Sequence, residues 1–242
     1  MQLRVAKTLE EKMCGFIQRV TDSPAVIALL EQIGLGDVVP SFQQEKEGIL
    51  NFYPAFGKNP DRQIKNVIIS PNKTVNATWW YDCQESGDSL NVGRRTTFNA
   101  RDLDSPYWKS AVKHCRALVI ATALGESKQV QKKKEHYLME ADSAVLIGAV
   151  YREFSNGLYS TAVITRPPHP AFKKYHEQSI PCFLPHDKQF ISAWLSGADD
   201  AAVKAELNNP KIHTGFTVTK VKTFKGGVAL SESERLSANR QQ

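Results

Sequence analysis

The sequence lacks long hydrophobic runs, and this absence excludes a transmembrane helix. Its longest apolar stretches are residues 117–123 and 144–150, far short of the roughly 20 residues that a helix needs to cross a bilayer. Residues 1–13 have no apolar core, so we find no secretory signal. We therefore expect a cytoplasmic protein without membrane association.

Cysteine is also scarce. The chain has four cysteines, at positions 14, 83, 115 and 182, and no two of them have Cys-x-x-Cys spacing. The six histidines do not fall at zinc-site intervals from them. Phosphate-binding glycine loops, hydrolase elbows and dinucleotide fingerprints are absent as well. We therefore expect reduced thiols, no metal ion and no other cofactor.

What the chain does have is the composition of an ordinary globular protein. Of its 242 residues, 41% are hydrophobic and 23% are charged, which excludes wholesale disorder and coiled coil. The length suits one large domain or two small ones, and no linker divides it. Its 31 Lys and Arg against 25 Asp and Glu give a net charge of +6, which permits a polyanionic partner without requiring one.

Strand signals outnumber helix signals along the chain. Helices are predicted where a serine precedes a proline in the first turn, as at Ser23-Pro24 and Ser105-Pro106. Strands are predicted from β-branched and aromatic runs, and Ser155-Asn156-Gly157 marks a hairpin turn. The predicted helices are residues 25–33, 105–114, 171–175, 189–195 and 201–207, and the predicted strands are 66–70, 74–81, 116–123, 136–140, 145–154, 158–165, 180–184 and 215–223, with an extended arm over 94–101.

The strands run together instead of alternating with helices, which predicts an α+β fold. We expect a single domain with a curved, mostly antiparallel or mixed, barrel-like β-sheet flanked by short helices. The basic segment 128–134 is predicted as a turn, and we favour a solvated loop over a nucleic-acid contact for it. Residues after about Ser231 are polar and are predicted to form a loose tail.

The chemistry available to Cys14 depends on whether it is the first residue of the chain. If the chain began at Met13, removal of that methionine would leave an amine and a thiol on adjacent carbons of Cys14. Such an amine has a pKa of about 7.7–8.0, so part of it is neutral and nucleophilic at pH 7. It can condense with an aldehyde to a Schiff base, and the thiol can then close a thiazolidine ring. As written, Cys14 is internal, so this chemistry requires the loss of residues 1–13.

Four polar residues in or beside predicted strands are further candidates. Glu126 follows a buried strand, where a carboxylate can move protons or can be an ordinary turn residue. Asn99 and Arg101 are two residues apart in an extended segment, so their side chains point to the same face. Asn99 can orient a substrate oxygen and Arg101 can hold a phosphate, or both can be ordinary capping residues of a loop. His176 precedes another predicted strand, and a lone histidine can be catalytic or structural.

Five short segments carry a family resemblance by their order along the chain. They are Met13-Cys14-Gly15, Trp79-Trp80, Phe98-Asn99-Ala100-Arg101, Arg116-Ala117-Leu118-Val119 with Glu126 ten residues after Arg116, and His176 ahead of Ile180-Pro181. Taken together, over most of residues 13–196, they resemble the SRAP family (SOS response-associated peptidase; abasic-site processing proteins).

The resemblance implies a protein that binds single-stranded DNA at abasic sites and forms a covalent thiazolidine DNA–protein crosslink. It implies that Cys14 is the nucleophile and that Asn99 positions the cysteine or the sugar. It also implies that Glu126 shuttles protons and that His176 assists sugar ring opening. The DNA-binding residues expected on this basis are Arg101, Trp79, Trp80, Arg94 and Arg95, although the two tryptophans fit core positions as well.

The sequence departs from the family pattern in several places, which indicates a divergent member. Thirteen residues precede Cys14, whereas family members usually start at the cysteine. The strand before Glu126 ends Ala123-Leu124-Gly125, where an aromatic pair is usual, and the arginine that normally follows the histidine is missing after His176. We expect a leader over residues 1–13 that is removed or reflects a misassigned start, an SRAP-like domain over 14–230, and a polar tail over 231–242.

Other functions stay open at this stage. One is a self-processing thiol peptidase, with Cys14 as nucleophile and Glu126 or His176 as base. Another is a module that binds single-stranded nucleic acid without covalent chemistry, and a third is an inactive relative that keeps the fold. For the leading hypothesis we expect a monomer whose partner is abasic single-stranded DNA, with autopeptidase (hydrolase) and lyase activity.

Overall fold

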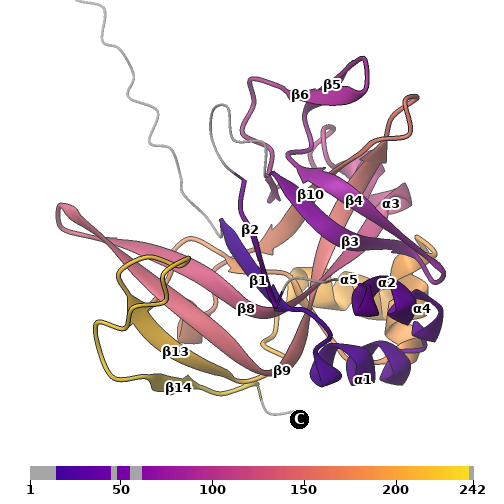
Figure 1. Cartoon of the computed structure of the whole chain (residues 1–242). Helices are drawn as coiled ribbons and strands as arrows, with labels where there is room; N and C mark the ends of the chain where they lie inside the picture. The colour runs from indigo at the N-terminus through magenta and orange to yellow at the C-terminus, as the bar shows by residue number, and fades with distance from the viewer. Residues whose placement is uncertain (1–14, 45–47, 55–61, 240–242) are drawn as a thin grey trace, which may run out of the picture.

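Five strands close into a barrel at the centre of the molecule (Figure 1). The computed structural model describes residues 15–44, 48–54 and 62–239. The barrel order is β8–β9–β10–β4–β3, and β3 returns to β8. Most pairs are antiparallel, while β10 and β4 are parallel. The prediction of a single α+β domain with a curved, mixed, barrel-like sheet is therefore confirmed. The five strands are β3 (Gln63–Ser70), β4 (Lys73–Trp79), β8 (Arg116–Val130), β9 (Lys133–Glu153) and β10 (Tyr159–Arg166).

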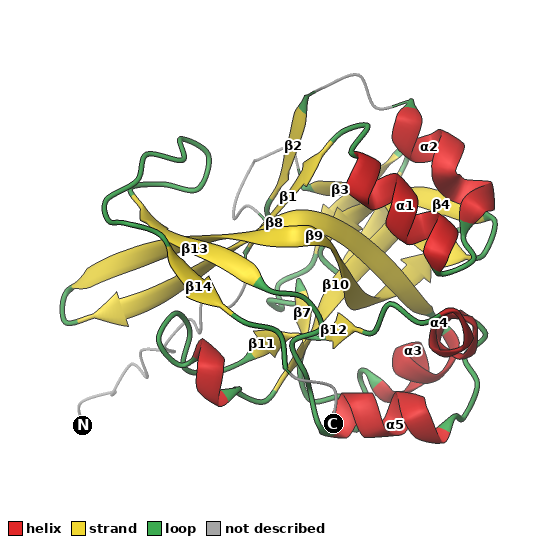
Figure 2. Cartoon of the chain, turned by 90° about the horizontal axis from the view of Figure 1, so that it is seen from below, coloured by secondary structure: helices red, strands yellow, loops and turns green. Residues whose placement is uncertain are grey.

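The two longest strands, β8 and β9, continue beyond the barrel as a projecting hairpin (Figures 1 and 2). Outer strands extend the sheet on both sides of this hairpin. Strand β1 (Phe16–Val20) pairs with β8 and with β2 (Ile49–Phe52). On the other side β13 (Phe216–Val221) pairs with β9 and with β14 (Glu234–Leu236). The remaining short strands are β5 (Cys83–Ser86), β6 (Ser89–Val92), β7 (Asn99–Ala100), β11 (Ile180–Pro181) and β12 (Phe183–Leu184).

The barrel strands bury both of their faces, which is why their sequences are nearly continuous apolar runs. The inner face forms one hydrophobic cluster, and the outer face forms a second cluster with the helices. The helices that cover this outer face are α1 (Pro24–Gln32), α2 (Val39–Gln43), α3 (Lys109–His114), α4 (Lys188–Leu195) and α5 (Ala201–Asn208), with the short 3₁₀ turn η1 (Gly36–Val38) (Figure 2). A second 3₁₀ turn, η2 (Pro170–Phe172), contributes Phe172 to the inner cluster.

The inward-facing pattern of β8 shifts by one residue partway along the strand. Odd-numbered residues face the barrel interior up to Ala121, but the next interior residue is Leu124. The shift falls at Thr122, where the register with β9 breaks and where the Thr122 Oγ1 atom accepts a hydrogen bond from the Val20 amide at 3.0 Å. As a result Glu126 shares the interior side with Leu124, whereas an unbroken alternation would turn it toward the helices.

Several predicted boundaries change in the structure. The two strands predicted at 136–140 and 145–154 are one strand, β9, and the basic segment 128–134 spans the tip of the β8–β9 hairpin. The extended arm over 94–101 is a strand only at β7, and the helix predicted from 105 begins at Lys109. The loose tail after Ser231 was a wrong prediction, because β14 pairs with β13 and the Asn239 amide donates to the Ile212 carbonyl.

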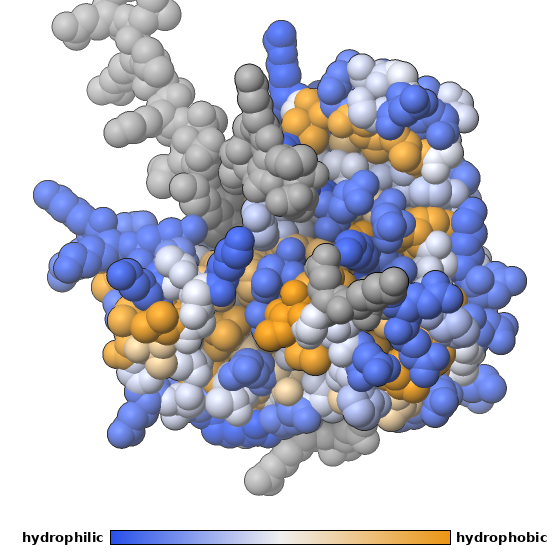
Figure 3. Space-filling model, in the orientation of Figure 1, coloured by the Kyte–Doolittle hydropathy of each residue, from blue (hydrophilic) through white to orange (hydrophobic). Residues whose placement is uncertain are grey.

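Hydrophilic side chains cover the projecting hairpin, and apolar patches on the same face lie apart from one another (Figure 3). The lysines at 132, 133 and 134 are exposed at the hairpin tip, in agreement with a solvated turn. Among the described residues, none of the helices has the length and apolar character to span a membrane.

We predict that Gly148→Ala will destabilise the fold. A Cβ at Gly148 would lie 2.9 Å from Trp194 Cζ2, and the Trp194 ring is held in place because its Nε1 donates to the Ala117 carbonyl at 3.0 Å. Overpacking of this kind costs about 1–3 kcal/mol of unfolding free energy, measurable by denaturant titration. Gly36→Ala is the matched control, since a Cβ there has no neighbour within 4 Å. Equal stability of the two variants would contradict the prediction.

Candidate active site

Glu126 lies on the part of β8 that extends beyond the register shift. It pairs with Tyr137 of β9 and is 1% exposed. Its direct neighbour in β8, Gly125, pairs with Phe16, the first residue of β1. The described chain therefore begins, at Gly15, beside the position of Glu126. Cys14, the predicted nucleophile, is the residue before Gly15 and lies outside the described residues.

His176 comes from a different part of the chain and meets Glu126 at this position. Its ring Nδ1 lies 3.7 Å from the Glu126 Oε2 atom and 3.1 Å from the Ser127 carbonyl oxygen. A carbonyl can only accept, so Nδ1 carries the hydrogen and Nε2 keeps its lone pair. The Nε2 atom is buried and has no hydrogen-bond partner among the described residues. His176 therefore presents a basic nitrogen beside a buried carboxyl group.

Burial lowers the pKa of His176 below its ordinary value of 6.5, because a buried imidazolium loses its hydration. The hydrogen bond to the Ser127 carbonyl opposes this shift in part, and the positive charge of Arg101 adds to it. The imidazole is thus neutral near pH 7. This is the protonation state in which it can accept a proton from a substrate.

Four interactions hold the loop that carries His176. Lys128 of β8 donates to the Lys173 carbonyl at 3.1 Å and pairs with Glu177 at 2.6 Å. Arg101 donates from Nη2 to the Gln178 carbonyl at 3.1 Å. On the far side of the loop, Lys174 forms an ion pair with Glu234 of β14. Residues of β8, of β14 and of the segment after β7 therefore hold this loop.

Asn99 and Arg101 lie at the edge of the barrel, on and just after β7. Asn99 is opposite Val163 of β10 and is 8% exposed. Because Val163 belongs to the interior cluster, its partner Asn99 faces the same side of the sheet. Arg101, two residues later, reaches the loop of His176 through the bond to Gln178. The structure thus brings Glu126, His176 and Arg101 together and places Asn99 on the interior side of the strand leading to Arg101.

The tryptophan and arginine residues expected to contact DNA have different surroundings. Trp79 is fully buried, and its Nε1 donates to the Phe98 carbonyl at 2.8 Å, so its ring cannot stack on a base. Trp80 is 4% exposed and lies under the Arg62 guanidinium, 5.1 Å from the ring centroid. Arg94 and Arg95 are exposed, and Arg95 lies over the Tyr107 ring. Of the two tryptophans, Trp79 is a core residue and the stacking role predicted for it was wrong.

Sequence analysis missed other residues that contact this site. Lys128 and Glu234 fix the histidine loop, and Phe224 packs over Gly125 and Phe16. Lys128 lies in the basic segment that we interpreted as a solvated turn. Glu234 lies in the segment that we interpreted as a tail. Phe224 follows a predicted edge strand, where a single aromatic residue has no periodic signal.

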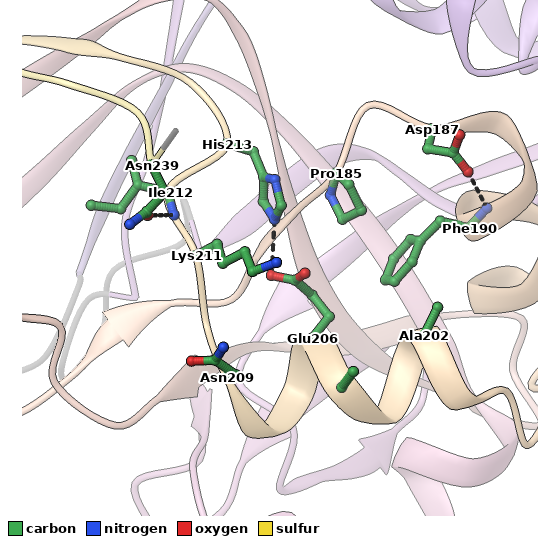
Figure 4. A pocket seen from close by; sticks show the side chains of 11 residues that line it. Pro185, Asp187, Phe190, Ala202, Glu206, Asn209, Lys211, Ile212, His213 and Asn239 are labelled. Atoms are coloured by element: carbon green, nitrogen blue, oxygen red, sulfur yellow. Dashed lines mark hydrogen bonds and ion pairs between the residues drawn. The ribbon is translucent and has the colours of Figure 1, made fainter. Parts of the chain in front are cut away.

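A separate cavity of about 430 Å³ lies between α4, α5 and the segment before β13 (Figure 4). Its lining includes Glu206 and His213, whose Oε1 and Nε2 atoms are 2.8 Å apart. None of the described residues predicted for the active site lines this cavity.

Among the described residues we also find no group of three or more His, Cys, Asp or Glu side chains that could hold a metal ion. The site around Glu126 combines a buried carboxyl group with the imidazole of His176 and is suited to proton transfer, and Arg101 beside the histidine loop is suited to anion contact.

The family model SRAP, "SOS response associated peptidase (SRAP)", matches residues 13–225. No curated protein sequence matches the chain.

Solved structures show the same fold at low sequence identity. A protein from Bacteroides thetaiotaomicron is 15% identical with a TM-score of 0.61, and the match covers 86% of this chain and 92% of the other. A protein from Bordetella bronchiseptica is also 15% identical, with a TM-score of 0.60 and coverage of 87% and 100%. A phage-related protein from the same organism has 15% identity, a TM-score of 0.56 and coverage of 91% and 100%.

We predict that His176→Gln will change the pH dependence of stability. Because the pKa of His176 is lowered in the folded state, the unfolded chain binds more protons below about pH 6.5, and the wild type loses stability as the pH falls through that value. The glutamine variant lacks this loss. The unfolding free energies of the wild type and of His176→Gln, measured between pH 8 and pH 5, should therefore converge or cross toward acid pH. Parallel curves would show that His176 is not buried as a neutral imidazole.

Proposed function

The chain belongs to the SRAP family, and on this premise we propose that it binds single-stranded DNA at abasic sites and forms a covalent crosslink through Cys14. Membership of the family associates the chain with the SOS response and with DNA damage. The covalent mechanism, the residues that perform it and the removal of the leader are our proposal. A cytoplasmic location is part of it, since the described cysteines Cys83, Cys115 and Cys182 carry free thiols.

One observation carries the proposal. Glu126 and His176, 50 residues apart in sequence, are both almost fully buried and lie 3.7 Å apart, beside the point where the described chain begins at Gly15. The Glu126 carboxyl group and the Nε2 atom of a neutral His176 can each exchange a proton with a group bound next to them. Gly15 is covalently bonded to Cys14, so the proposed nucleophile is attached to the residue that lies at this pair.

The proposed reaction is a condensation that releases one water molecule. The neutral α-amine of Cys14 adds to the aldehyde carbon of the ring-opened abasic sugar and gives a carbinolamine. Loss of water, with a proton delivered to the departing oxygen, gives the Schiff base. The Cys14 sulfur then adds to the imine carbon, the nitrogen takes up a proton, and a thiazolidine ring closes. Glu126 and His176 supply and remove these protons.

Further contacts to DNA follow from the placement of the other residues. Arg101 lies beside the histidine loop, where its guanidinium can hold a phosphate next to the lesion. Asn99, on the same side of the barrel edge, positions the sugar or the cysteine. The exposed Arg94 and Arg95 extend the basic surface for the strand. Trp80 is 4% exposed and lies under Arg62, so neither tryptophan is part of the proposed DNA contact.

A free amine at Cys14 requires that residues 1–13 be absent from the active protein. The description of the family as a peptidase favours a second activity, hydrolysis of the Met13–Cys14 bond by the same site. In this step the Cys14 thiol is the nucleophile and Glu126 or His176 is the base. Intact-mass measurement of purified wild type, Cys14→Ala and Glu126→Gln tests it. Loss of the leader only in the wild type supports self-cleavage, whereas loss in all three indicates another protease.

We predict that protein starting at Cys14 forms a heat-stable adduct with an abasic single-stranded oligonucleotide, and that Cys14→Ala abolishes it. The reason is that no other cysteine can offer both an amine and a thiol. The measurement is a shifted band on a denaturing gel. Cys115→Ala is the matched control, because Cys115 is a partly exposed thiol on another part of the chain, and it should crosslink like the wild type.

The same assay separates the proposal from a module that binds nucleic acid without covalent chemistry. Such a module would bind abasic and intact oligonucleotides alike, in a salt-dependent and reversible way. Wild-type protein with a free Cys14 that gives no shifted band would end the crosslinking proposal.

We also predict that Glu126→Gln will slow crosslinking by about 10²–10⁴-fold, the usual range for loss of a general acid–base group. The amide keeps the size of the side chain but cannot exchange protons. Single-turnover rates at saturating oligonucleotide measure this effect. Glu135→Gln is the control. Glu135 lies on the projecting hairpin, where its carboxylate forms an ion pair with Lys220 of β13. If the two variants crosslink equally fast, Glu126 has no part in the chemistry.

A further inference from the structure

Phe224 reaches from the loop after β13 to the start of β1. Its ring is stacked on the Phe16 ring, with centroids 5.0 Å apart and an interplanar angle of 19°. The ring also contacts the His136 ring in a T-shaped arrangement, at a centroid distance of 4.9 Å. His136 in turn contacts Ser127, the neighbour of Glu126, through its Nδ1 atom at 3.1 Å from the serine oxygen. The Phe224 ring therefore links the first residue of β1 with the strand that carries Glu126.

Gly125 provides the space that the Phe224 ring occupies. A Cβ at Gly125 would lie 2.7 Å from two carbons of the Phe224 ring and 2.9 Å from the Phe16 Cβ. Cβ atoms do not approach other heavy atoms so closely, so any side chain at 125 would displace the ring. Gly125 is directly before Glu126 and pairs with Phe16. The absence of a side chain there lets the two aromatic rings stack over the strand.

The loop that carries Phe224 is itself held by backbone hydrogen bonds. The Lys222 amide donates to the Val228 carbonyl at 2.9 Å, and the Leu230 amide donates to the Lys220 carbonyl at 2.7 Å. Within the loop, the Gly227 amide donates to the Thr223 carbonyl at 3.2 Å. Phe224 thus projects from an ordered turn at the end of the sheet and not from a free segment.

We propose that Phe224 is a positioning residue that holds the start of β1 beside Glu126. The inference rests on the proposed function. Strand ends fray unless other contacts hold them, and β1 pairs with β8 only over residues 16–18. Addition of an amine to an aldehyde depends on close placement of the two groups, and a small displacement can cost up to about a hundredfold in rate. Stacking on Phe16 fixes the strand two residues after the nucleophile.

Phe224→Ala tests this inference with two measurements on protein starting at Cys14. We expect the single-turnover crosslinking rate at saturating abasic oligonucleotide to fall about tenfold or more, while the affinity for the oligonucleotide stays within about twofold. We also expect hydrogen exchange at the amides of residues 16–18 to become about tenfold faster, a factor that corresponds to about 1.4 kcal/mol. Phe224→Tyr keeps the ring and should behave as the wild type.

Two further variants separate positioning from a general loss of structure. Val228→Ala removes an exposed apolar side chain from the same loop, and it should leave both measurements unchanged. Gly125→Ala should slow crosslinking because its Cβ displaces the Phe224 ring. In the double variant with Phe224→Ala the clash with the ring is gone and only the 2.9 Å approach to the Phe16 Cβ remains. The two changes together should therefore slow crosslinking by less than the product of their separate effects.

The outcomes distinguish this inference from the proposed function. If the wild type crosslinks and Phe224→Ala does so equally fast, the positioning role is overturned and the proposed function stands. Unchanged hydrogen exchange in Phe224→Ala overturns the role as well, whatever the crosslinking rate. If the wild type forms no adduct, the proposed function fails, and the catalytic role of Phe224 fails with it.

Discussion

The antiparallel pairing of β8 with β9 is the constraint on which the rest of the structure depends. The first half of β8 closes the barrel, and the second half extends beyond it and carries Glu126. The two halves meet at the register shift at Thr122. Before the shift odd-numbered residues face the interior, and after it even-numbered residues do. The orientation of Glu126 toward the interior therefore follows from one irregularity in one pair of strands. Glu126 is as a result a buried carboxyl group on the interior side. The other interpretation of its sequence position, an ordinary turn residue, is wrong.

The elements predicted well are those whose own residues specify them. The helix after Ser23 has its capping and proline signals within four residues, and the strand from residue 116 is a continuous apolar run. β1 and β14 were missed because each is short and mixes polar with apolar residues, so that only the partner strand makes it a strand. The meeting of Glu126 with His176 could be expected only through the family resemblance, because contacts between residues 50 positions apart are set by the tertiary fold. The resemblance did not reveal that Trp79 is a core residue, since an aromatic pair in a strand looks the same in either role.

The candidate site is costly for stability, and this supports a functional interpretation of it. His176 is buried with its Nε2 atom lacking a hydrogen-bond partner among the described residues, although a buried polar atom without a partner typically costs about 1–3 kcal/mol. A fold selected for stability alone would replace this group with an apolar side chain of similar size. The loop is instead held by Lys128, Arg101 and the contact from β14, so the unfavourable group is kept in one orientation. The burial that lowers the pKa of His176 also keeps its imidazole neutral, the form that can act as a base.

The C-terminal part of the chain contributes to both sides of this site. Glu234 of β14 pairs with Lys174 beside the histidine loop, and Phe224 stacks on Phe16 beside the start of β1. The departure from the family pattern at Leu124-Gly125 gains a physical explanation here, since the Phe224 ring fills the space over Gly125. An aromatic ring from a distant loop thus packs where the strand itself has no side chain. The space beside Glu126 is therefore filled by an aromatic ring although the strand itself supplies none there. A departure from a family motif is therefore not by itself evidence of lost function, because a group from another segment can occupy the same space.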